Sequence, residues 1–412
     1  MNDTAVLKFG GTSVKSIARI QHVCRIVESL SQSRPVVVVV SAMGDTTDYL
    51  LKLARQVSSS PDKRELDLLL STGEQISIAL TAMTLRQMGV RALSFTGGQV
   101  GIFTENVHNK ARIVDINGDV IERALADGRV VVVAGFQGVN EKGDITTLGR
   151  GGSDTTAVAL AVSLGAGVCD IYTDVDGIYT ADPNVISGAR LLSRISYGEV
   201  LEMARLGAQV IHPRAVELAR RYGIKLRVRN TFHPEMEGTT IDQGENMEIF
   251  RTVSGVAIDK DQACVAIMDV PDQPGIAARI TQALCEENIV IDMIMQSFHP
   301  TIGLNNITFT VNDSDLDQTI NSLSALKDEL RAREVLADPD IAKVSLIGAG
   351  LVGQPTIPAK LFGVLGANGI NIKMISSSEM KITCVVARQQ ADRAAALIHQ
   401  AFELDAVCDT RA

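Results

Sequence analysis

The sequence predicts an α/β protein in which a mainly parallel sheet with helices on both faces precedes two small βαββαβ modules. Three observations predict this fold class: valine runs that alternate with helical patterns, a lapse of that alternation near residue 231, and an internal repeat after it. The 412 residues suffice for two or three domains with large cores. A hydrophobic content of 46% and a charged content of 21% are typical of a globular enzyme and exclude a largely disordered chain.

Two valine runs predict strands that are buried on both faces of a parallel sheet. These runs are Val36–Val40 and Val130–Val133, and Ala5–Leu7 is a shorter run of the same kind. Between the first two strands, apolar residues recur at steps of three and four from Ile17 to Leu30, which predicts an amphipathic helix. Strands and helices in alternation indicate an α/β sandwich over residues 1–230.

The second half of the chain repeats itself. The alternation lapses over residues 231–258, which are rich in turn-forming residues and are expected to be a linker. Beyond this linker, Pro274–Ile294 aligns with Pro355–Ile375 at a constant offset of 81 residues. Each copy shows the order strand, turn, helix, strand, strand, helix, which predicts one βαββαβ module. We expect the first module over 259–336 and the second over 337–412, packed against each other.

Charge and cysteine usage exclude several function classes. The 39 Lys and Arg against 48 Asp and Glu give a net charge of −9, which argues against nucleic-acid or acidic-membrane binding as the main role. The six cysteines form no Cys-x-x-Cys pair, so structural disulfides and a zinc site are not expected. The longest uncharged stretch, Val344–Ala359, is interrupted by glycines and prolines and is no spanning helix. The amino terminus lacks the pattern of a secretion signal, so we expect a cytoplasmic protein.

A lysine and two glycines stand between the first strand and the first helix. In Lys8-Phe9-Gly10-Gly11-Thr12-Ser13, the glycines let the backbone approach a ligand, and free N–H groups at the helix start attract an anion. Lys8 adds a positive charge suited to a phosphate. The alternative is an ordinary turn with a solvated lysine. The segment is not a Walker A loop, because there the lysine follows the glycines.

A second glycine-rich segment, Gly149–Thr156, stands at a predicted helix start. Its Arg150 lies between glycines and is able to bind a carboxylate with both arms of the guanidinium group, while the glycines leave room for a small ligand. Asp154 in the same segment has a simpler interpretation as a helix N-cap. The arginine between glycines favours a ligand site, since an N-cap does not require it.

Two further segments are weaker candidates for the same site. Ser41–Thr47 follows the first valine run at its carboxyl end, where open parallel sheets bind ligands. Glu74 begins an apolar helical pattern, so by itself it is more often a capping or first-turn acid than a ligand.

Three aspartates occur in the segment Tyr172–Pro183, which leaves another predicted strand. Their spacing is similar to the start of a calcium-binding loop, but the terminal glutamate of such loops is missing. A loop that holds a nucleotide, with Tyr179 over the base, is the favoured interpretation.

The letters of a dinucleotide fingerprint appear in Gly348–Gly353 after an apolar strand. Pro355 and Pro358 interrupt the helix that the fingerprint requires, and the acid that binds the ribose is absent. We therefore reject NAD binding.

In their order and spacing, the three segments Lys8–Ser13, Gly149–Thr155 and Tyr172–Pro183 resemble those of the aspartate kinases within the amino acid kinase family. The doubled module resembles the paired ACT domains of the same enzymes, so the resemblance covers nearly all 412 residues. It implies an amino acid kinase three-layer sandwich followed by two ferredoxin-like ACT modules. It also implies transfer of the ATP γ-phosphoryl group to the β-carboxylate of L-aspartate, which gives 4-phospho-L-aspartate and begins lysine, threonine and methionine biosynthesis.

The resemblance assigns roles to individual residues. Lys8 is expected to neutralise the transferred phosphoryl group and Asp154 to orient the reacting groups. Arg150 is expected to hold the α-carboxylate of aspartate and Glu74 its ammonium. The other expected substrate ligands are Ser41, Thr47, Gly151, Gly152 and Ser153. The expected ATP ligands are Lys8, Gly10, Gly11, Thr173, Asp174, Tyr179 and Asp182. Mg²⁺ is expected to arrive with ATP and to keep several waters, without a protein cage.

The resemblance also implies feedback inhibition by lysine, threonine or both at an effector site between modules. The expected effector ligands are Asp272, Ala277, Ile291, Asp292, Gln296, Asn371, Ile372, Ser378 and Glu379. Asp272 would bind the effector ammonium, and N–H groups near Ala277 and Ile372 its carboxylate. From the residues alone, these positions are also compatible with ordinary turns and sheet edges.

The expected partners are L-aspartate, ATP, the effectors and further copies of the chain bound through the ACT modules, without nucleic acid or membrane. Met247-Glu248 in the expected linker resembles the internal start from which some family members make a separate, shorter regulatory chain.

Two residues depart from the family pattern. Asn184 stands where members usually carry an arginine, and Gln209 where a lysine is common. Both changes remove a cation expected near the phosphates, and Arg214 is a candidate to replace it. Two alternatives therefore stay open: an amino-acid sensor with an inactive kinase domain, and a kinase for another amino acid such as glutamate.

Overall fold

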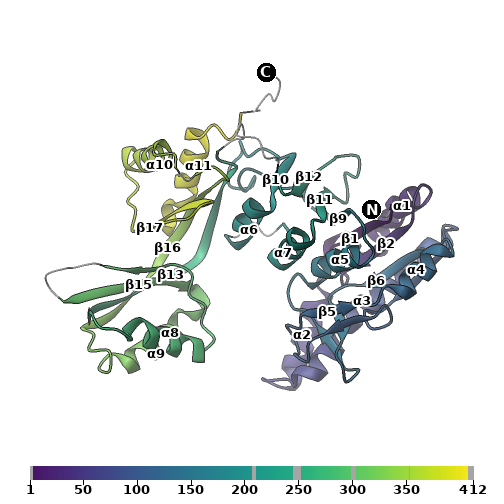
Figure 1. Cartoon of the computed structure of the whole chain (residues 1–412), viewed down its shortest axis with the longest axis horizontal. Helices are drawn as coiled ribbons and strands as arrows, with labels where there is room; N and C mark the ends of the chain where they lie inside the picture. Colours follow the sequence, from purple (N-terminus) through teal and green to yellow (C-terminus); the bar gives the residue numbers. More distant parts are fainter. Residues whose placement is uncertain (1–2, 207–209, 245–251, 298–302, 352, 407–412) are drawn as a thin grey trace. The chain divides into compact units, whose positions relative to one another are not determined.

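The computed structural model describes residues 3–206, 210–244, 252–297, 303–351 and 353–406 (Figure 1). These residues form two compact units, each of which is described by itself. The first unit holds the described residues up to 179, then 191–205 and 210–244. The second unit holds residues 180–190 and the described residues from 252 onward.

The first unit is built on an eight-stranded sheet with the strand order β10-β12-β11-β9-β1-β2-β6-β3. Its strands are β1 (Ala5–Phe9), β2 (Val36–Val40), β3 (Ala92–Phe95), β6 (Val130–Ala134), β9 (Val168–Thr173), β10 (Arg194–Ser196), β11 (Lys225–Asn230) and β12 (Thr239–Asp242). All neighbours are parallel except β11 and β12. The valine runs are fully buried central strands, as the sequence predicts.

Helices cover both faces of this sheet, so the unit has three layers (Figure 1). The helices are α1 (Ile17–Ser31), α2 (Thr46–Val57), α3 (Lys63–Gln87), α4 (Asp119–Ala126), α5 (Gly152–Ser163), α6 (Tyr197–Arg205) and α7 (Pro213–Tyr222). Apolar residues of α1 and α3 share a core with Leu7, Val38 and Val132. Helix α5 packs on β1, β2 and β9 with a wholly apolar middle. Alternate strand residues thus face the two helical layers.

A small second sheet flanks the first, with the order β5-β4-β7-β8. It comprises β4 (Ile102–Thr104), β5 (Ile113–Ile116), β7 (Gln137–Val139) and β8 (Ile145–Thr147). Strand β8 ends just before Gly149, so this sheet delivers the glycine-rich segment to α5.

Among the described helices, α3 alone is long and apolar enough to span a membrane by length and composition. Half of its most apolar window is buried within the unit, where it packs on α1 and on the sheet. We therefore interpret α3 as a core helix of the first unit.

The expectation of a linker over 231–258 is wrong, because two strands lie wholly or partly within this range. Strand β12 lies within it and pairs with β10 and β11, and an ion pair of 2.8 Å between Arg194 and Asp242 fixes its end. Strand β13 already begins at Gly255. The run Thr239–Asp242 is too short and too polar for its strand character to be visible in the sequence.

The second unit contains one six-stranded antiparallel sheet with the order β14-β15-β13-β16-β18-β17. The strands are β13 (Gly255–Pro271), β14 (Ile294–Gln296), β15 (Leu304–Asn312), β16 (Glu334–Ile347), β17 (Met374–Ser377) and β18 (Lys381–Ala387). The helices are α8 (Ile276–Glu286), α9 (Leu316–Leu326), α10 (Thr356–Ala367) and α11 (Ala391–Ala401). Both predicted modules are present, and they share this sheet.

The two modules interleave, which corrects the expected boundaries at 259 and 337. The amino half of β13 pairs with Lys343–Ile347, and its carboxyl half pairs with Glu334–Asp338. Gly255–Asp259 therefore serves as the fourth strand of the second module, although it precedes the first. The boundary at 337 falls inside β16. A repeat in the sequence does not reveal that a strand is shared.

Residues 180–190 leave the first unit and pack in the second, so the expected domain 1–230 is not continuous. Ala181 and Ile186 join the apolar core formed by α10 and α11. Thr180 lies 2.9 Å from His399 of α11, Oγ1 to Nε2, and its carbonyl accepts a bond of 2.8 Å from the N–H of Val256. Tyr179 and Leu191, at the two ends of the excursion, form an antiparallel bridge in the first unit.

Candidate functional site

A buried ion pair joins the end of β1 to the first turn of α5. Lys8 Nζ lies 2.7 Å from Asp154 Oδ1, and the two side chains are only 12% and 10% exposed. The second oxygen, Oδ2, accepts a bond of 3.2 Å from the backbone N–H of His212. Gly151 is the N-cap of α5, so the interpretation of Asp154 as the N-cap is wrong. The pair presents one cation and one anion at the carboxyl ends of parallel strands, where such sheets bind ligands.

The backbone beside this pair is closely packed, and at Gly11 it leaves no room for a side chain. A Cβ atom on Gly10 would lie 3.4 Å from Lys8 Nζ, and one on Gly11 would lie 2.9 Å from the carbonyl oxygen of Ala42. Gly11 begins a short 3-10 helix, so its N–H group points outward from the helix start. Gly11 thus brings a main-chain donor near the Lys8 ammonium, an arrangement that suits a phosphate group, whereas the N–H of Gly10 donates to the carbonyl of Tyr172 over 3.3 Å.

The glycine-rich segment before α5 depends on a left-handed residue. Gly151 has φ +68°, and a Cβ atom there would lie 2.0 Å from the His212 ring. Ser153, two residues later, is buried against Gly135 at the end of β6, where a Cβ atom would lie 2.6 Å from its Oγ. Arg150 is exposed and makes no hydrogen bond or ion pair with the described residues. Its guanidinium group is therefore available to a ligand carboxylate.

Glu74 is buried in the middle of α3, and only one of its two carboxylate oxygens has a hydrogen-bond partner among the described residues. The residue is 3% exposed, Oε1 accepts a bond of 3.0 Å from the N–H of Ala42, and Oε2 is buried without a partner in the described part of the chain. Burial raises the pKa of Glu74 to about 7. The first-turn interpretation is wrong, because α3 begins at Lys63. A buried carboxylate oxygen without a donor is suited to a ligand ammonium.

The remaining predicted substrate residues follow the ends of β2. The N–H of Ser41 donates to the carbonyl of Phe9 over 3.1 Å, which joins the carboxyl ends of β1 and β2. Thr47 lies half-buried in the first turn of α2. The structure thus gathers Lys8, Ser41 and Asp154 around adjoining strand ends.

The predicted nucleotide loop is held by its own side chains. Tyr179 donates to Asp176 over 3.1 Å, Asn230 donates to the same carboxylate over 2.7 Å, and Thr173 donates to Asp174 over 3.2 Å. Burial and the bond to Asp176 raise the pKa of Tyr179. Asp176 therefore orders this loop, a role that the three similar aspartates of the sequence did not reveal.

Asp182 belongs to the second unit, unlike Thr173, Asp174 and Tyr179. Its carboxylate accepts bonds of 2.9 and 3.0 Å from the backbone and side-chain nitrogens of Asn184. Asn184, at the position where family members usually carry arginine, thus closes a turn at Asp182. Gln209, the second departure, lies outside the described residues.

Two residues anchor the segment before Gly149, of which the sequence singled out only Arg214, and for a different role. Asp67 is fully buried and accepts bonds from Thr147 Oγ1 at 2.5 Å and from the N–H of Asn109 at 3.0 Å, and its Oδ2 lies 2.8 Å from His108 Nδ1. Arg214 donates to the carbonyls of Leu148 and Ala111 over 2.6 and 3.1 Å. Arg214 therefore holds backbone carbonyls and is not a free cation. The available signal was Asp67 itself, an acid inside an apolar helical run.

The predicted effector residues lie at opposite edges of the second sheet. Asp292 and Gln296 flank or belong to the edge strand β14, whereas Asn371, Ile372 and Ser378 flank the other edge strand, β17. Asp272 and Ala277 belong to the turn before α8 and to its first residues. One copy of the chain does not bring these residues together. Asp292 also accepts a bond of 2.5 Å from Lys343, whose side chain is fully buried.

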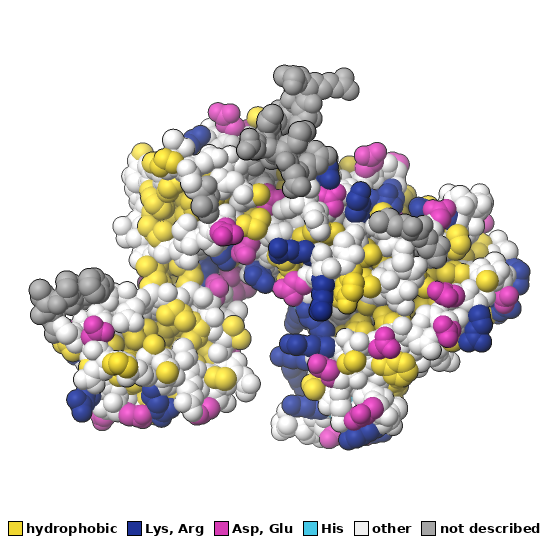
Figure 2. All heavy atoms as spheres, in the orientation of Figure 1, with side chains coloured by type: hydrophobic (Ala, Val, Ile, Leu, Met, Phe, Trp, Pro, Cys, Tyr) yellow, Lys and Arg dark blue, Asp and Glu magenta, His cyan; other side chains and the backbone are white. Residues whose placement is uncertain are grey.

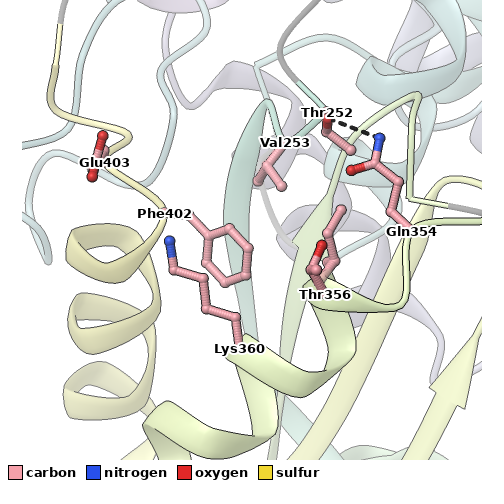
Figure 3. A pocket seen from close by; sticks show the side chains of 8 residues that line it. Thr252, Val253, Gln354, Thr356, Lys360, Phe402 and Glu403 are labelled. Atoms are coloured by element: carbon pink, nitrogen blue, oxygen red, sulfur yellow. Dashed lines mark hydrogen bonds between the residues drawn. The ribbon is translucent and has the colours of Figure 1, made fainter.

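A cavity of about 320 Å³ lies on the second module, where α10 begins (Figure 3). The Lys360 ammonium lies 4.9 Å from the centre of the Phe402 ring, and Gln354 donates to Thr252 over 3.3 Å. The cavity borders the end of the segment with the dinucleotide letters. Strand β16 before that segment is antiparallel to both neighbours, so it has no parallel βαβ unit of the dinucleotide-binding kind.

Comparisons with known proteins agree with this architecture. The amino acid kinase family model matches residues 3–230, and the ACT domain model matches residues 268–326 and 344–402. An aspartokinase from Bacillus sp. (strain MGA3) is 48% identical over 400 residues, 97% of each chain. E. coli aspartokinase III in complex with aspartate and ADP is 27% identical, with a TM-score of 0.80 over 97% of this chain and 99% of that one. The same enzyme with lysine and aspartate gives 28% identity and a TM-score of 0.76 over 96% of this chain and 99% of that one.

Proposed function

The chain belongs to the amino acid kinase family and carries two ACT domains after its kinase domain, and we propose that it acts as an aspartate kinase. It transfers the γ-phosphoryl group of ATP to the β-carboxylate of L-aspartate and forms 4-phospho-L-aspartate. The observation that carries this proposal is the buried Lys8–Asp154 pair at the strand ends of a chain that is 48% identical to an aspartokinase.

Charge neutralisation explains what Lys8 contributes. The attacking carboxylate is already ionised at neutral pH, so the reaction needs no strong base, and its barrier comes from bringing an anion up to a phosphate. The Lys8 ammonium lies beside Gly10 and, together with the backbone N–H group of Gly11 at the start of the 3-10 helix, is placed to stabilise the charge on the transferred group. Asp154 keeps Lys8 in position when no phosphate is bound.

The amino acid is recognised at its two charged ends. Glu74 Oε2, buried and without a partner among the described residues, is suited to the ammonium. The exposed and unpaired Arg150 is suited to the α-carboxylate, with Ser41, Thr47, Gly151, Gly152 and Ser153 around them. This polarity leaves the side-chain carboxylate for phosphorylation.

The nucleotide is ATP, which we assign to Lys8, Gly10, Gly11, Thr173, Asp174, Tyr179 and Asp182. Support comes from the ADP bound to the E. coli relative and from the glycine-lined backbone beside Lys8. Mg²⁺ accompanies ATP and offsets charge on the phosphates. It would keep several waters and would need no protein cage.

Lysine, threonine or both inhibit the enzyme through the ACT modules. The reaction is the first step of lysine, threonine and methionine biosynthesis, and it takes place in the cytoplasm. The E. coli relative was solved with lysine bound. In this chain the predicted effector ligands lie on opposite sheet edges, so a complete site requires a second copy whose β17 edge meets the β14 edge of the first. The effector thereby favours one arrangement of the copies. Met247, at which a shorter regulatory chain is predicted to start, lies outside the described residues.

Substitution of Lys8 tests the proposed activity. Hydroxamate formation with L-aspartate, ATP and Mg²⁺ is expected to fall about 100- to 1,000-fold in Lys8→Ala, because one preorganised charge is lost. Lys52→Ala, an exposed lysine of α2, is the matched control and is expected to match the parent. Turnover of glutamate but not of aspartate would show that the substrate is glutamate. Absence of turnover with every carboxylate, with lysine still bound, would identify a sensor without kinase activity.

A further inference from the structure

A cavity of about 520 Å³ opens at the edge of the large sheet that lies opposite to the phosphoryl-transfer site. It is lined by residues at or just before the amino ends of β2, β3 and β6, whereas Lys8 and Ser41 stand at the carboxyl ends of β1 and β2. Because these strands are parallel, their amino and carboxyl ends lie at different edges of the sheet. The cavity is therefore separate from the site described above.

Three arginines line this cavity, one before each of the three strands: Arg34, Arg91 and Arg129. Glu28 is the only acidic residue in the lining. The chain as a whole carries a charge of −9, and on the face shown in Figure 2 basic side chains are interspersed with acidic ones. Three guanidinium groups around one hollow are thus a local excess of positive charge.

The protein neutralises these arginines only in part. Arg34 and Arg91 form no ion pair or side-chain hydrogen bond with the described residues. Arg129 approaches Asp127 only to 3.7 Å, and its Nε is buried without an acceptor in the described part of the chain. The three residues follow the carboxyl ends of α1, α3 and α4, where cations are favoured, yet no guanidinium group donates to a carbonyl there. The helix dipoles therefore explain part of their placement, whereas their side-chain N–H groups are left for another acceptor.

We propose that this cavity binds a small polyanion, a molecule with at least two phosphate or carboxylate groups. Guanidinium groups bind both kinds of oxyanion with paired hydrogen bonds. A bound oxyanion would also give the buried Nε of Arg129 the hydrogen-bond acceptor that it lacks among the described residues. The volume is that of a small-molecule site, and Met88, Val90 and Leu125 supply apolar surface for a carbon skeleton. The bound anion bridges three strand starts and stabilises the folded first unit. This inference does not depend on the proposed kinase activity.

Titration of the full-length chain with inorganic pyrophosphate and, separately, with citrate tests the proposal. We expect saturable binding of at least one probe, weakened at least tenfold in Arg34→Ala, Arg91→Ala and Arg129→Ala. Arg86→Ala, an exposed arginine at the end of α3 that does not line the cavity, is the matched control and is expected to bind like the parent. The stronger of the two probes decides between a phosphate and a polycarboxylate ligand.

Lys8→Ala separates this cavity from the phosphoryl-transfer site. Binding that survives Lys8→Ala but not the three cavity variants supports the proposal. Binding that disappears only in Lys8→Ala, or no saturable binding of either probe, overturns it. Arg34→Lys keeps the charge and the fold, so retained binding there excludes unfolding as the cause of loss in Arg34→Ala.

Discussion

At the scale of single residues, the site contains charged groups with polar atoms that lack a hydrogen-bond or ion-pair partner among the described residues and are suited to bind a ligand. Lys8 and Asp154 neutralise each other at 2.7 Å, whereas Glu74 is buried with one oxygen unused. Burial alone raises the pKa of Glu74 to about 7, so the empty site holds this carboxyl partly protonated at neutral pH. A substrate ammonium reverses this, because an adjacent cation favours the ionised form.

Aspartate binding is therefore expected to release a proton from Glu74 near and below pH 7. The apparent affinity for aspartate should weaken as the pH falls below about 7, by at most tenfold per pH unit, and should level off above it. Calorimetry in buffers of different ionisation enthalpy measures the proton release directly. Glu74→Gln should bind aspartate more weakly without this pH dependence; an unchanged pH profile in that variant would contradict the role of Glu74.

Gly151 is expected to tolerate no side chain. Gly151→Ala would place a Cβ atom 2.0 Å from the His212 ring at φ +68°, so we expect a loss of about 1–3 kcal/mol in unfolding free energy together with reduced turnover. The matched control is Gly143→Ala, which shares a positive φ of +81° but has open space around it. Denaturant unfolding of both variants gives the comparison. Equal effects would show that backbone conformation alone, and not the contact with His212, limits the site.

At the scale of elements, the second unit is organised by strands that serve two modules. The amino half of β13 completes the second module although it precedes the first in the chain. The four residues Gly255, Val256, Ala257 and Ile258 pair with the end of β16, and Val256 contributes to the core of that module. The boundary of a stable fragment is thus set by a strand, not by the repeat.

A fragment comprising residues 252–412 is expected to fold better than one comprising 260–412. Without Gly255–Asp259 the second module loses a strand, and the edge of β16 is left unpaired and prone to aggregation. Size-exclusion chromatography and limited proteolysis of the two fragments compare them, since both lack residues 180–190 equally. Equal behaviour of the two fragments would show that the shared strand is dispensable.

The sequence predicted the elements with strong periodicity and the residues in glycine-rich motifs. Valine runs gave the central strands, and Lys8 and Asp154 were found because glycines and charges cluster around them. Asp67 and His212 were missed because their partners are distant in sequence and adjacent only in space. Strand β12 was missed because four residues show too little periodicity.

At the scale of the whole molecule, the chain passes between the kinase unit and the ACT unit at several places. These include Leu206 after α6, the passage to β13, and the excursion of residues 180–190, which begins directly after Tyr179 of the predicted nucleotide loop. The excursion is fixed in the ACT unit by the Thr180–His399 bond and by Ala181 and Ile186 in the core. We therefore expect the backbone at Tyr179 and Thr180 to couple the ACT unit to the predicted nucleotide loop.

Thr180→Val is expected to weaken feedback inhibition more than it weakens uninhibited turnover. The variant keeps the shape of the side chain but loses the bond to His399 and the bond of 2.9 Å that Thr180 Oγ1 accepts from the N–H of Arg190, at a cost of about 1–3 kcal/mol to the ACT unit. The concentrations of lysine and threonine that halve turnover, measured for variant and parent, check this. Thr84→Val in α3 of the kinase unit is the control, because it also removes a threonine hydrogen bond, the one of 2.8 Å to the carbonyl of Leu80, but is not linked to α11. A parent-like inhibition curve for Thr180→Val would contradict the coupling.

The most direct test of the account is hydroxamate formation by the unmodified chain from L-aspartate, ATP and Mg²⁺, with lysine and threonine added separately and together. We predict that the chain turns over aspartate and that this turnover falls when one or both of these amino acids are present. Turnover that is absent with aspartate under all of these conditions would contradict it.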